Sequence, residues 1–232
     1  MTPIQLVLMP GMDGTGDMFE PLVRAIAATS ATCKIQILRY PANQPLNYAE
    51  LIEFAAGQLP NSPCMLIAES FSGPIAIELA ARFPSQVQRV VLSTSFVSNP
   101  LPWLALMAPM IDFLPITHAP NWLMQQQLFN GDATPELNLA LAQAIDSISP
   151  AVIRARLKAI LNVDASASMK RLTQPLLYLQ ADADRLVPER CAQEVESVLA
   201  SSTICRLAGP HCLLQIAPTQ AWQTIQAWLQ ET

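Results

Sequence analysis

The amino-acid sequence predicts an α/β fold: a mainly parallel six-stranded sheet with helices on both faces, and a helical insertion. Three observations predict it. Short apolar runs alternate with segments of helical periodicity, residues 96–171 interrupt that alternation, and five of the seven glycines fall in loops that follow the apolar runs. The 232 residues suffice for one domain with a sizeable core.

The predicted strands are continuous apolar runs rather than alternating ones, which is typical of strands buried on both faces of a parallel sheet. They are Ile4–Met9, Ile35–Tyr40, Cys64–Ala68, Val90–Ser93, Leu176–Gln180 and Thr203–Leu207. Helical spacing of apolar residues predicts helices at Phe19–Ala28, Ala49–Leu59, Pro74–Arg82, Glu189–Leu199 and Thr219–Leu229. Strands and helices in this order predict right-handed crossovers.

The interruption at residues 96–171 reads as a series of helices punctuated by prolines. We expect them at Pro102–Phe113, Asn121–Phe129, Pro135–Ser147 and Pro150–Leu161. The segment is rich in large apolar side chains: Trp103, Met107, Met110, Trp122, Met124 and Phe129. Either this apolar face packs on the sheet or it forms a cap that lines a pocket, and the two are compatible. We expect residues 1–95 and 172–232 to form the core, residues 96–171 to form a helical cap insertion, and His118 within it to be structural.

Composition excludes several classes of protein. Hydrophobic residues make up 51% and charged residues 13%, which excludes intrinsic disorder. The net charge of −5 with no basic run predicts no nucleic-acid partner. No cationic start precedes the first apolar stretch, and no run reaches the roughly 20 apolar residues of a membrane span, so we expect a cytoplasmic protein. Five cysteines without a C-x-x-C pair, and two histidines, predict no metal site and no disulfide framework.

The loop after the third predicted strand contains a candidate nucleophile. Cys64–Ala68 runs into Ser70 and then directly into a helix. A serine at such a strained strand-to-helix turn forms a nucleophile elbow, whose usual pattern is G-x-S-x-G. Ala68 and Ser72 replace both glycines here but keep the residues small. The alternative is that Ser70 caps the following helix, a frequent role of serine.

Two later strand ends carry the partners that a nucleophilic serine needs. A serine is a poor nucleophile without a base that a carboxylate orients. Asp182 and Asp184 follow the strand Leu176–Gln180, and His211 follows the strand Thr203–Leu207. Carboxyl ends of parallel strands meet at one edge of a sheet, so these groups are expected to come together. Either aspartate could reach the histidine, and the other would cap the turn.

Two backbone N–H groups are predicted to stabilise a developing oxyanion. One belongs to Phe71, directly after the candidate nucleophile. The other belongs to Met12, in the glycine-containing loop after the first strand. A phosphate-binding loop is the rival interpretation, but the loop lacks a G-K-[ST] ending, and Asp13 and Asp17 would repel phosphate.

Four motifs together resemble the α/β-hydrolase fold superfamily: LVLMPGMDGTG, ESFSGP, ADADRLVP and GPHCLLQ. The chain is similar in particular to the small bacterial members and to esterase/lipase/acyltransferase-like proteins whose opening reads PGxDGTG. The resemblance extends from Ile4 to Leu229 and implies a minimal six-stranded version of the fold. It also implies that Asp184, three residues before Val187, is the orienting acid.

These observations predict a serine hydrolase that cleaves a small-molecule ester or thioester of an apolar acyl group. Ser70 would attack the carbonyl, His211 would transfer the proton, Asp184 would orient His211, and the N–H groups of Met12 and Phe71 would hold the oxyanion. No metal or organic cofactor is expected. Two alternatives stay open: an acyltransferase that uses the same acyl-enzyme, and a non-catalytic ligand-binding protein with this fold.

Overall fold

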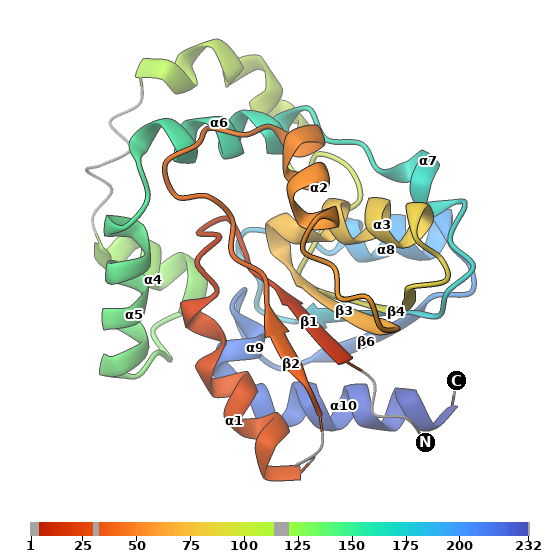
Figure 1. The fold of residues 1–232 in the computed structure, drawn as a ribbon. Coiled ribbons are helices and arrows are strands. Elements are labelled where there is room, and N and C mark those ends of the chain that lie inside the picture. Colours follow the sequence, from red (N-terminus) through yellow and green to blue (C-terminus); the bar gives the residue numbers. More distant parts are fainter. Residues whose placement is uncertain (1–4, 30–32, 114–120, 232) are drawn as a thin grey trace.

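Six strands form one sheet in the order β2-β1-β3-β4-β5-β6, and every neighbouring pair is parallel (Figure 1). The computed structural model describes residues 5–29, 33–113 and 121–231. The strands are β1 (Gln5–Met9), β2 (Ile35–Ile37), β3 (Cys64–Glu69), β4 (Val87–Ser93), β5 (Leu176–Ala181) and β6 (Thr203–Leu207). The predicted α/β architecture with a parallel six-stranded sheet is therefore confirmed.

Helices cover both faces of the sheet. The α-helices are α1 (Glu20–Thr29), α2 (Tyr48–Ala56), α3 (Gly73–Arg82), α4 (Asn121–Phe129), α5 (Pro135–Asp146), α6 (Pro150–Leu161), α7 (Ser166–Met169), α8 (Arg190–Val198), α9 (Leu213–Ile216) and α10 (Pro218–Glu231). Short 3-10 helices are η1 (Asp17–Phe19), η2 (Ser70–Ser72) and η3 (Pro102–Phe113). Helices α2, α3 and α8 pack on one face, whereas α1, α9 and α10 pack on the other.

The strands supply alternate side chains to these two layers, as the period of two along a strand requires. Along β3, Leu66 and Ala68 join the cluster under α2 and α3, whereas Met65 and Ile67 join the cluster under α1 and α10. Every residue of β3 is buried. Continuous apolarity in the sequence therefore reflects a strand buried on both faces.

The structure departs from the predicted elements in several places. β4 begins at Val87 rather than Val90, and α2 ends at Ala56 rather than Leu59. β2 ends at Ile37 rather than Tyr40, because the chain bends and the Tyr40 N–H donates to the carbonyl of Gly14 in the loop after β1. Segment Pro102–Phe113 is a 3-10 helix, and Pro109 within it has no N–H to donate to an α-helical ladder. The one-turn helices α7 and α9 were not predicted, because four residues are too few to show helical periodicity.

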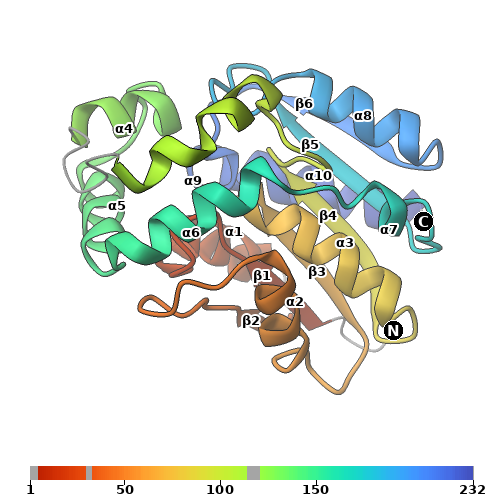
Figure 2. The same cartoon turned by 90° about the horizontal axis from the view of Figure 1, so that it is seen from above.

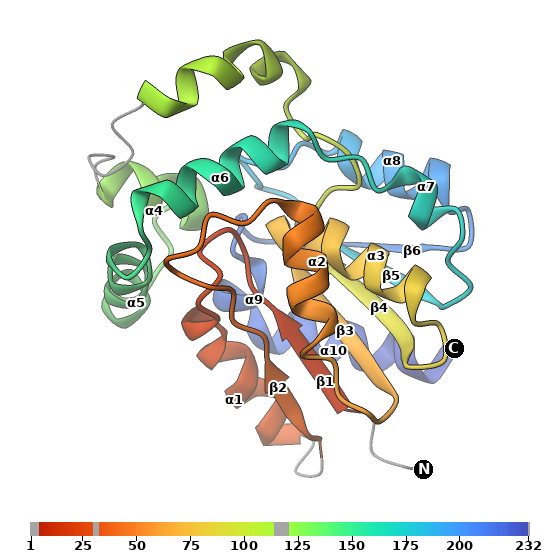
Figure 3. The same ribbon diagram turned by 45° about the horizontal axis from the view of Figure 1, so that its top comes forward.

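Helices η3, α4, α5 and α6 lie between β4 and β5 in the sequence. Figures 2 and 3 show α6 running between η3 and the core, with α4 and α5 near its N-terminal end. The chain leaves and re-enters the core at one place, because Ser98 forms a β-bridge with Asp164 and the Ala165 N–H donates to the Val97 carbonyl. The ends of this segment are thus tied together.

Several large apolar side chains of this segment face solvent. Trp103 and Trp122 are each 67% exposed, and Met110 is 52% exposed. Phe129 is buried in a cluster with Met18 and Cys212 of the core. Met107 lies in η3, and only its backbone is described, whereas His118 lies outside the described residues. Among the described helices, none has the length and hydropathy needed to cross a membrane.

Candidate active site

The turn after β3 holds Ser70 in an uncommon backbone conformation. Its φ angle is 48°, in the left-handed region that non-glycine residues rarely adopt. Its carbonyl accepts hydrogen bonds from the Ser95 hydroxyl, at 2.6 Å, and from the Gly73 N–H. Ser70 does not cap a helix, since Glu69 precedes η2 and Ser72 precedes α3. The strained turn leaves the Ser70 hydroxyl free to point toward other loops.

Three side chains from three strand ends converge at this turn. Nε2 of His211 lies 3.0 Å from Oγ of Ser70, and Nδ1 lies 2.9 Å from Oδ2 of Asp184. With the ring proton on Nδ1 donated to Asp184, Nε2 is free to accept the Ser70 hydroxyl proton. The structure thus brings together the serine, histidine and aspartate singled out in the sequence.

The two aspartates of the loop after β5 have different partners. Asp184 also accepts hydrogen bonds from the N–H groups of Leu186 and Val187, at 2.8 and 2.9 Å, which fix its carboxylate. Oδ1 of Asp182 accepts from the Gly209 N–H at 3.0 Å and caps the adjoining turn. Asp184 therefore faces His211, and Asp182 supports the loop that carries it.

Opposing effects act on the pKa of His211. Burial disfavours the charged imidazolium and lowers the pKa, but the attraction and hydrogen bond of Asp184, with a smaller contribution from Glu69, outweigh it. The net result is a pKa above the usual value for histidine. The site therefore stabilises the protonated imidazolium form of His211.

The N–H groups of Phe71 and Met12 are oriented through their own peptide planes. A trans peptide directs its N–H opposite to its carbonyl, so fixing the carbonyl fixes the N–H. The Ser70 carbonyl is held as described above, and the Gly11 carbonyl accepts from the Gly14 N–H at 3.0 Å. The aromatic ring of Phe71 stacks on Tyr48, with 4.7 Å between centroids. These contacts restrain both predicted donor groups.

Ser72 occupies the position where the usual nucleophile elbow has its second glycine. It is fully buried, its hydroxyl donates to the Pro10 carbonyl, and it accepts a 2.6 Å hydrogen bond from the Tyr40 hydroxyl. The elbow is thus tied to the loop after β1 through a side chain that glycine lacks. Smallness at position 72 was apparent in the sequence, whereas its partners were not.

Glu69 is a second buried carboxyl group beside the candidate nucleophile, and sequence analysis assigned no role to it. Oε2 accepts a 3.1 Å hydrogen bond from Gln215, and Oε1 has no hydrogen-bond partner among the described residues. Burial raises its pKa to about 7, although His211 and the Gln215 hydrogen bond oppose the rise. Its charge state therefore changes near neutral pH.

The helices between β4 and β5 contact all three loops of the site. The Cys212 N–H donates to the Leu128 carbonyl at 3.0 Å, next to His211. The Asn130 side chain donates to the Ala183 carbonyl at 3.0 Å, next to Asp184. Arg156 of α6 donates to the loop that carries Met12. Sequence reasoning missed Arg156, although it lies on the stripe of Val152 and Ala159 that faces the core.

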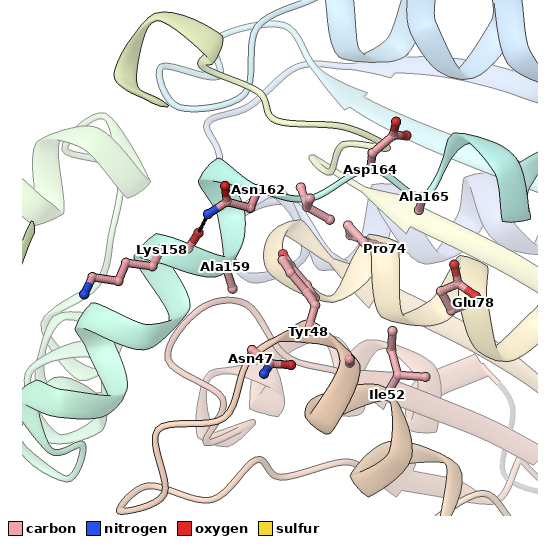
Figure 4. Close-up of a pocket in the computed structure, with 12 residues that line it drawn as sticks. Asn47, Tyr48, Ile52, Pro74, Glu78, Lys158, Ala159, Asn162, Asp164 and Ala165 are labelled. Atoms are coloured by element: carbon pink, nitrogen blue, oxygen red, sulfur yellow. Dashed lines mark hydrogen bonds between the residues drawn. The ribbon is translucent and has the colours of Figure 1, made fainter. Parts of the chain in front are cut away.

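A cavity of about 380 Å³ lies between α6 and the core, and Figure 4 shows the residues that line it. Residues of α2, α3 and α6 line it, together with residues 162–165, and Tyr48 points into it. Ser70 is not among its lining residues.

A family model described as serine aminopeptidase, S33, matches residues 46–209. The biotin biosynthesis bifunctional protein BioHC of Cellvibrio japonicus is 26% identical over 97% of the chain, and the chain spans only 42% of that relative. The pimeloyl-[acyl-carrier protein] methyl ester esterase of Neisseria meningitidis is 22% identical over 86% of the chain and 83% of the relative.

Solved structures share the fold at low sequence identity. The enol-lactonase from Burkholderia xenovorans LB400 superposes with a TM-score of 0.82 at 17% identity. The superposition covers 99% of this chain and 92% of the enol-lactonase. The fold is therefore shared along almost the whole chain.

Proposed function

The chain belongs to the serine aminopeptidase S33 family of α/β-hydrolases, and from this premise we propose that it is a serine hydrolase that cleaves carboxylic esters or thioesters. One observation carries the proposal: His211 lies within hydrogen-bond distance of both Ser70 and Asp184. That constellation is recognised by geometry and by the roles of its members rather than by sequence position.

In the proposed reaction, Ser70 attacks the acyl carbonyl while His211 takes its proton. The N–H groups of Met12 and Phe71 stabilise the oxyanion of the tetrahedral intermediate. His211 then donates the proton to the leaving alcohol or thiol, and an acyl-enzyme on Ser70 remains. Water activated by His211 releases the acid, and Asp184 keeps the ring oriented throughout.

We propose an uncharged, apolar acyl group as the substrate class. The segment 96–171 presents Trp103, Met110 and Trp122 to solvent. Its Phe129 packs in one cluster with Cys212, the residue directly after His211. One curated relative is an esterase of a pimeloyl methyl ester carried on an acyl carrier protein, which is an ester of a mainly aliphatic acyl chain. An alkyl ester of a medium-length acyl chain fits these features.

We further propose that residues 96–171 act as a cap over a core of residues 1–95 and 172–232. The hydrogen bonds from this segment to the loops of Met12, Asp184 and His211 support that role. A cytoplasmic location stays a prediction from the sequence.

Labelling with a fluorophosphonate tests the proposal directly. A serine hydrolase takes up one probe per chain at Ser70, whereas a non-catalytic protein with this fold takes up none. Hydrolysis of p-nitrophenyl esters of increasing chain length then tests the acyl preference. Each methylene that enters an apolar pocket is worth about 0.8 kcal/mol, so kcat/KM should rise over several carbons. A profile that falls from acetate onward would contradict an apolar acyl pocket, and products formed with added methanol would reveal acyl transfer.

A further inference from the structure

Arg156 is a buried cation whose guanidinium donates to three backbone carbonyls. The side chain is 1% exposed, although it belongs to α6, a helix of the segment between β4 and β5. Nη1 donates to the carbonyls of Met12 and Asp13, at 2.8 and 2.7 Å, and Nη2 donates to the carbonyl of Pro41 at 3.0 Å. A buried guanidinium is costly unless its donors are satisfied, so this placement is specific.

The carbonyls that Arg156 holds belong to the loop that presents the Met12 N–H. Its two bonds to Met12 and Asp13 fix two consecutive peptide planes, since a trans peptide is rigid. The preceding plane is held by the Gly14 N–H on the Gly11 carbonyl. Arg156 therefore restrains the loop immediately after the donor group that the proposed reaction requires.

Close packing at Gly14 supports the same conclusion. A Cβ atom at this position would lie 2.6 Å from Nη1 of Arg156, and the φ angle of Gly14 is +71°. Only glycine permits both this backbone conformation and the approach of the guanidinium. The loop and the arginine are thus fitted to each other.

Hollows flank α6 where it does not contact this loop. The cavity of Figure 4 lies beside its C-terminal half, and a second hollow of about 370 Å³ is lined by Pro45, Asp112, Ala151, Arg154, Ala155 and Lys158. The buried side chains of α6 are Val152, Arg156 and Ala159, and Arg156 is the one that can donate hydrogen bonds. Among the buried side chains of α6 that the structure describes, it therefore forms the polar link to the loop after β1.

We propose that Arg156 is a positioning residue for ester hydrolysis, which sets the oxyanion-stabilising loop from the helix that covers it. The inference rests on the proposed function, because it assigns the Met12 N–H a part in the reaction. Arginine is required rather than lysine, since a guanidinium reaches several carbonyls at once and an ammonium is a single point of charge.

The test compares Arg156→Met and Arg156→Lys with Lys158→Met, a change of another cation on α6 whose partner is the exposed carboxylate of Asp112. Kinetics are expressed per active site titrated with fluorophosphonate, so that unfolded protein does not count. Arg156→Met should lower kcat about 10- to 100-fold with KM within about threefold, less than the 10²- to 10³-fold loss for deleting an oxyanion donor outright. The kcat of Arg156→Lys should fall between those of Arg156→Met and the wild type. The kcat of Lys158→Met should stay within about twofold of the wild-type value.

Hydrogen exchange of the peptide spanning residues 10–17 provides the second readout. It should speed up in Arg156→Met and less so in Arg156→Lys, and it should be unchanged in Lys158→Met. A kcat per titrated site within about threefold of the wild type in Arg156→Met, or unchanged exchange in the loop, would overturn the inference. If Arg156→Met does not fold, Arg156→Lys decides by the same two measurements. If the wild-type protein neither labels nor hydrolyses esters, the proposed function fails, and loop exchange alone decides whether Arg156 positions the loop.

Discussion

Nδ1 of His211 lies 2.9 Å from Oδ2 of Asp184, and both side chains are only 5% exposed. The pairing selects the tautomer whose Nε2 faces Ser70 at 3.0 Å. The neighbouring carboxylate of Asp182 is occupied instead by the Gly209 N–H. Exchange of either carboxylate for an amide therefore has a different expected consequence.

Asp184→Asn should leave the fold intact and lower kcat steeply, because an amide can donate to Nδ1 and so favour the wrong tautomer. The comparable change in a serine protease costs roughly 10⁴-fold. Asp182→Asn is the matched control and should cost less than about tenfold, since an amide oxygen can still accept from Gly209. Steady-state kinetics with circular dichroism checks both, and a large loss at 182 with near-normal activity at 184 would reverse the assignment.

Ser70→Ala should abolish fluorophosphonate labelling and reduce ester hydrolysis to what binding and the oxyanion donors provide. Ser85→Ala, a change of an exposed serine outside the site, should label and hydrolyse like the wild type. Intact-mass spectrometry counts the bound probe. Stoichiometric labelling of Ser70→Ala would assign the nucleophile to another residue.

Glu69→Gln should remove part of the pH dependence of stability. The folded-state pKa of about 7 is above the ordinary value of 4.5, so the stability associated with protonated Glu69 is present below pH 4.5 and lost as the pH rises through 7. The loss amounts to roughly 3 kcal/mol. Urea unfolding should therefore give Glu69→Gln the same free energy of unfolding as the wild type near pH 4 and a higher one at pH 8.

The raised pKa of His211 acts on stability in the same direction, since its contribution is also lost as the pH rises. Glu69→Gln should leave this part of the slope in place. Because ionised Glu69 helps to raise the pKa of His211, the variant should also move the acidic limb of the kcat/KM profile to lower pH. Unfolding curves that keep the full wild-type slope between pH 4.5 and 7 would rule out a titrating Glu69.

Ser72→Ala should cost about 1–3 kcal/mol of unfolding free energy, because the buried Tyr40 hydroxyl and the Pro10 carbonyl both lose a partner. Tyr40→Phe should cost less, since Ser72 keeps its bond to Pro10. The double variant should be more stable than the sum of the single effects predicts, because removing both hydroxyls leaves neither unpaired. Denaturant unfolding measures this coupling, and additivity within about 0.3 kcal/mol would mean that the two hydroxyls act independently.

The strands and the serine, histidine and aspartate positions could be predicted because each depends on a short stretch of sequence. Buried parallel strands are apolar throughout, and the residues after them gather at one edge of the sheet, as Ser70 and His211 do. The sheet's order reverses beside β1, so the loop after β1 lies next to the turn after β3. Chain order and strand ends therefore sufficed to predict this part.

The supporting residues could not be predicted because their partners lie far away in the sequence. Arg156 is 144 positions from Met12, and Gln215 is 146 positions from Glu69. In the sequence, Arg156 resembles the other cations of α6, and only its place on the buried stripe sets it apart. The substitution of Ser72 for glycine was visible, but the hydroxyl's use depends on Tyr40, which the sequence placed in β2. Pairings of this kind arise only once the tertiary structure is fixed.

The bridge between Ser98 and Asp164 brings the two ends of the helical segment side by side, at the neighbouring strands β4 and β5. A segment whose two ends lie side by side can be exchanged for one of another length without disturbing the sheet. Inserted domains are tolerated for the same reason. Under the proposed cap role, recombination of this segment would change the substrate range. An incoming segment would, however, have to bring its own donor to the Met12 and Asp13 carbonyls, because Arg156 would leave with the old one. Grafted chimaeras should therefore be selected for a guanidinium at that point as well as for the shape of their binding surface.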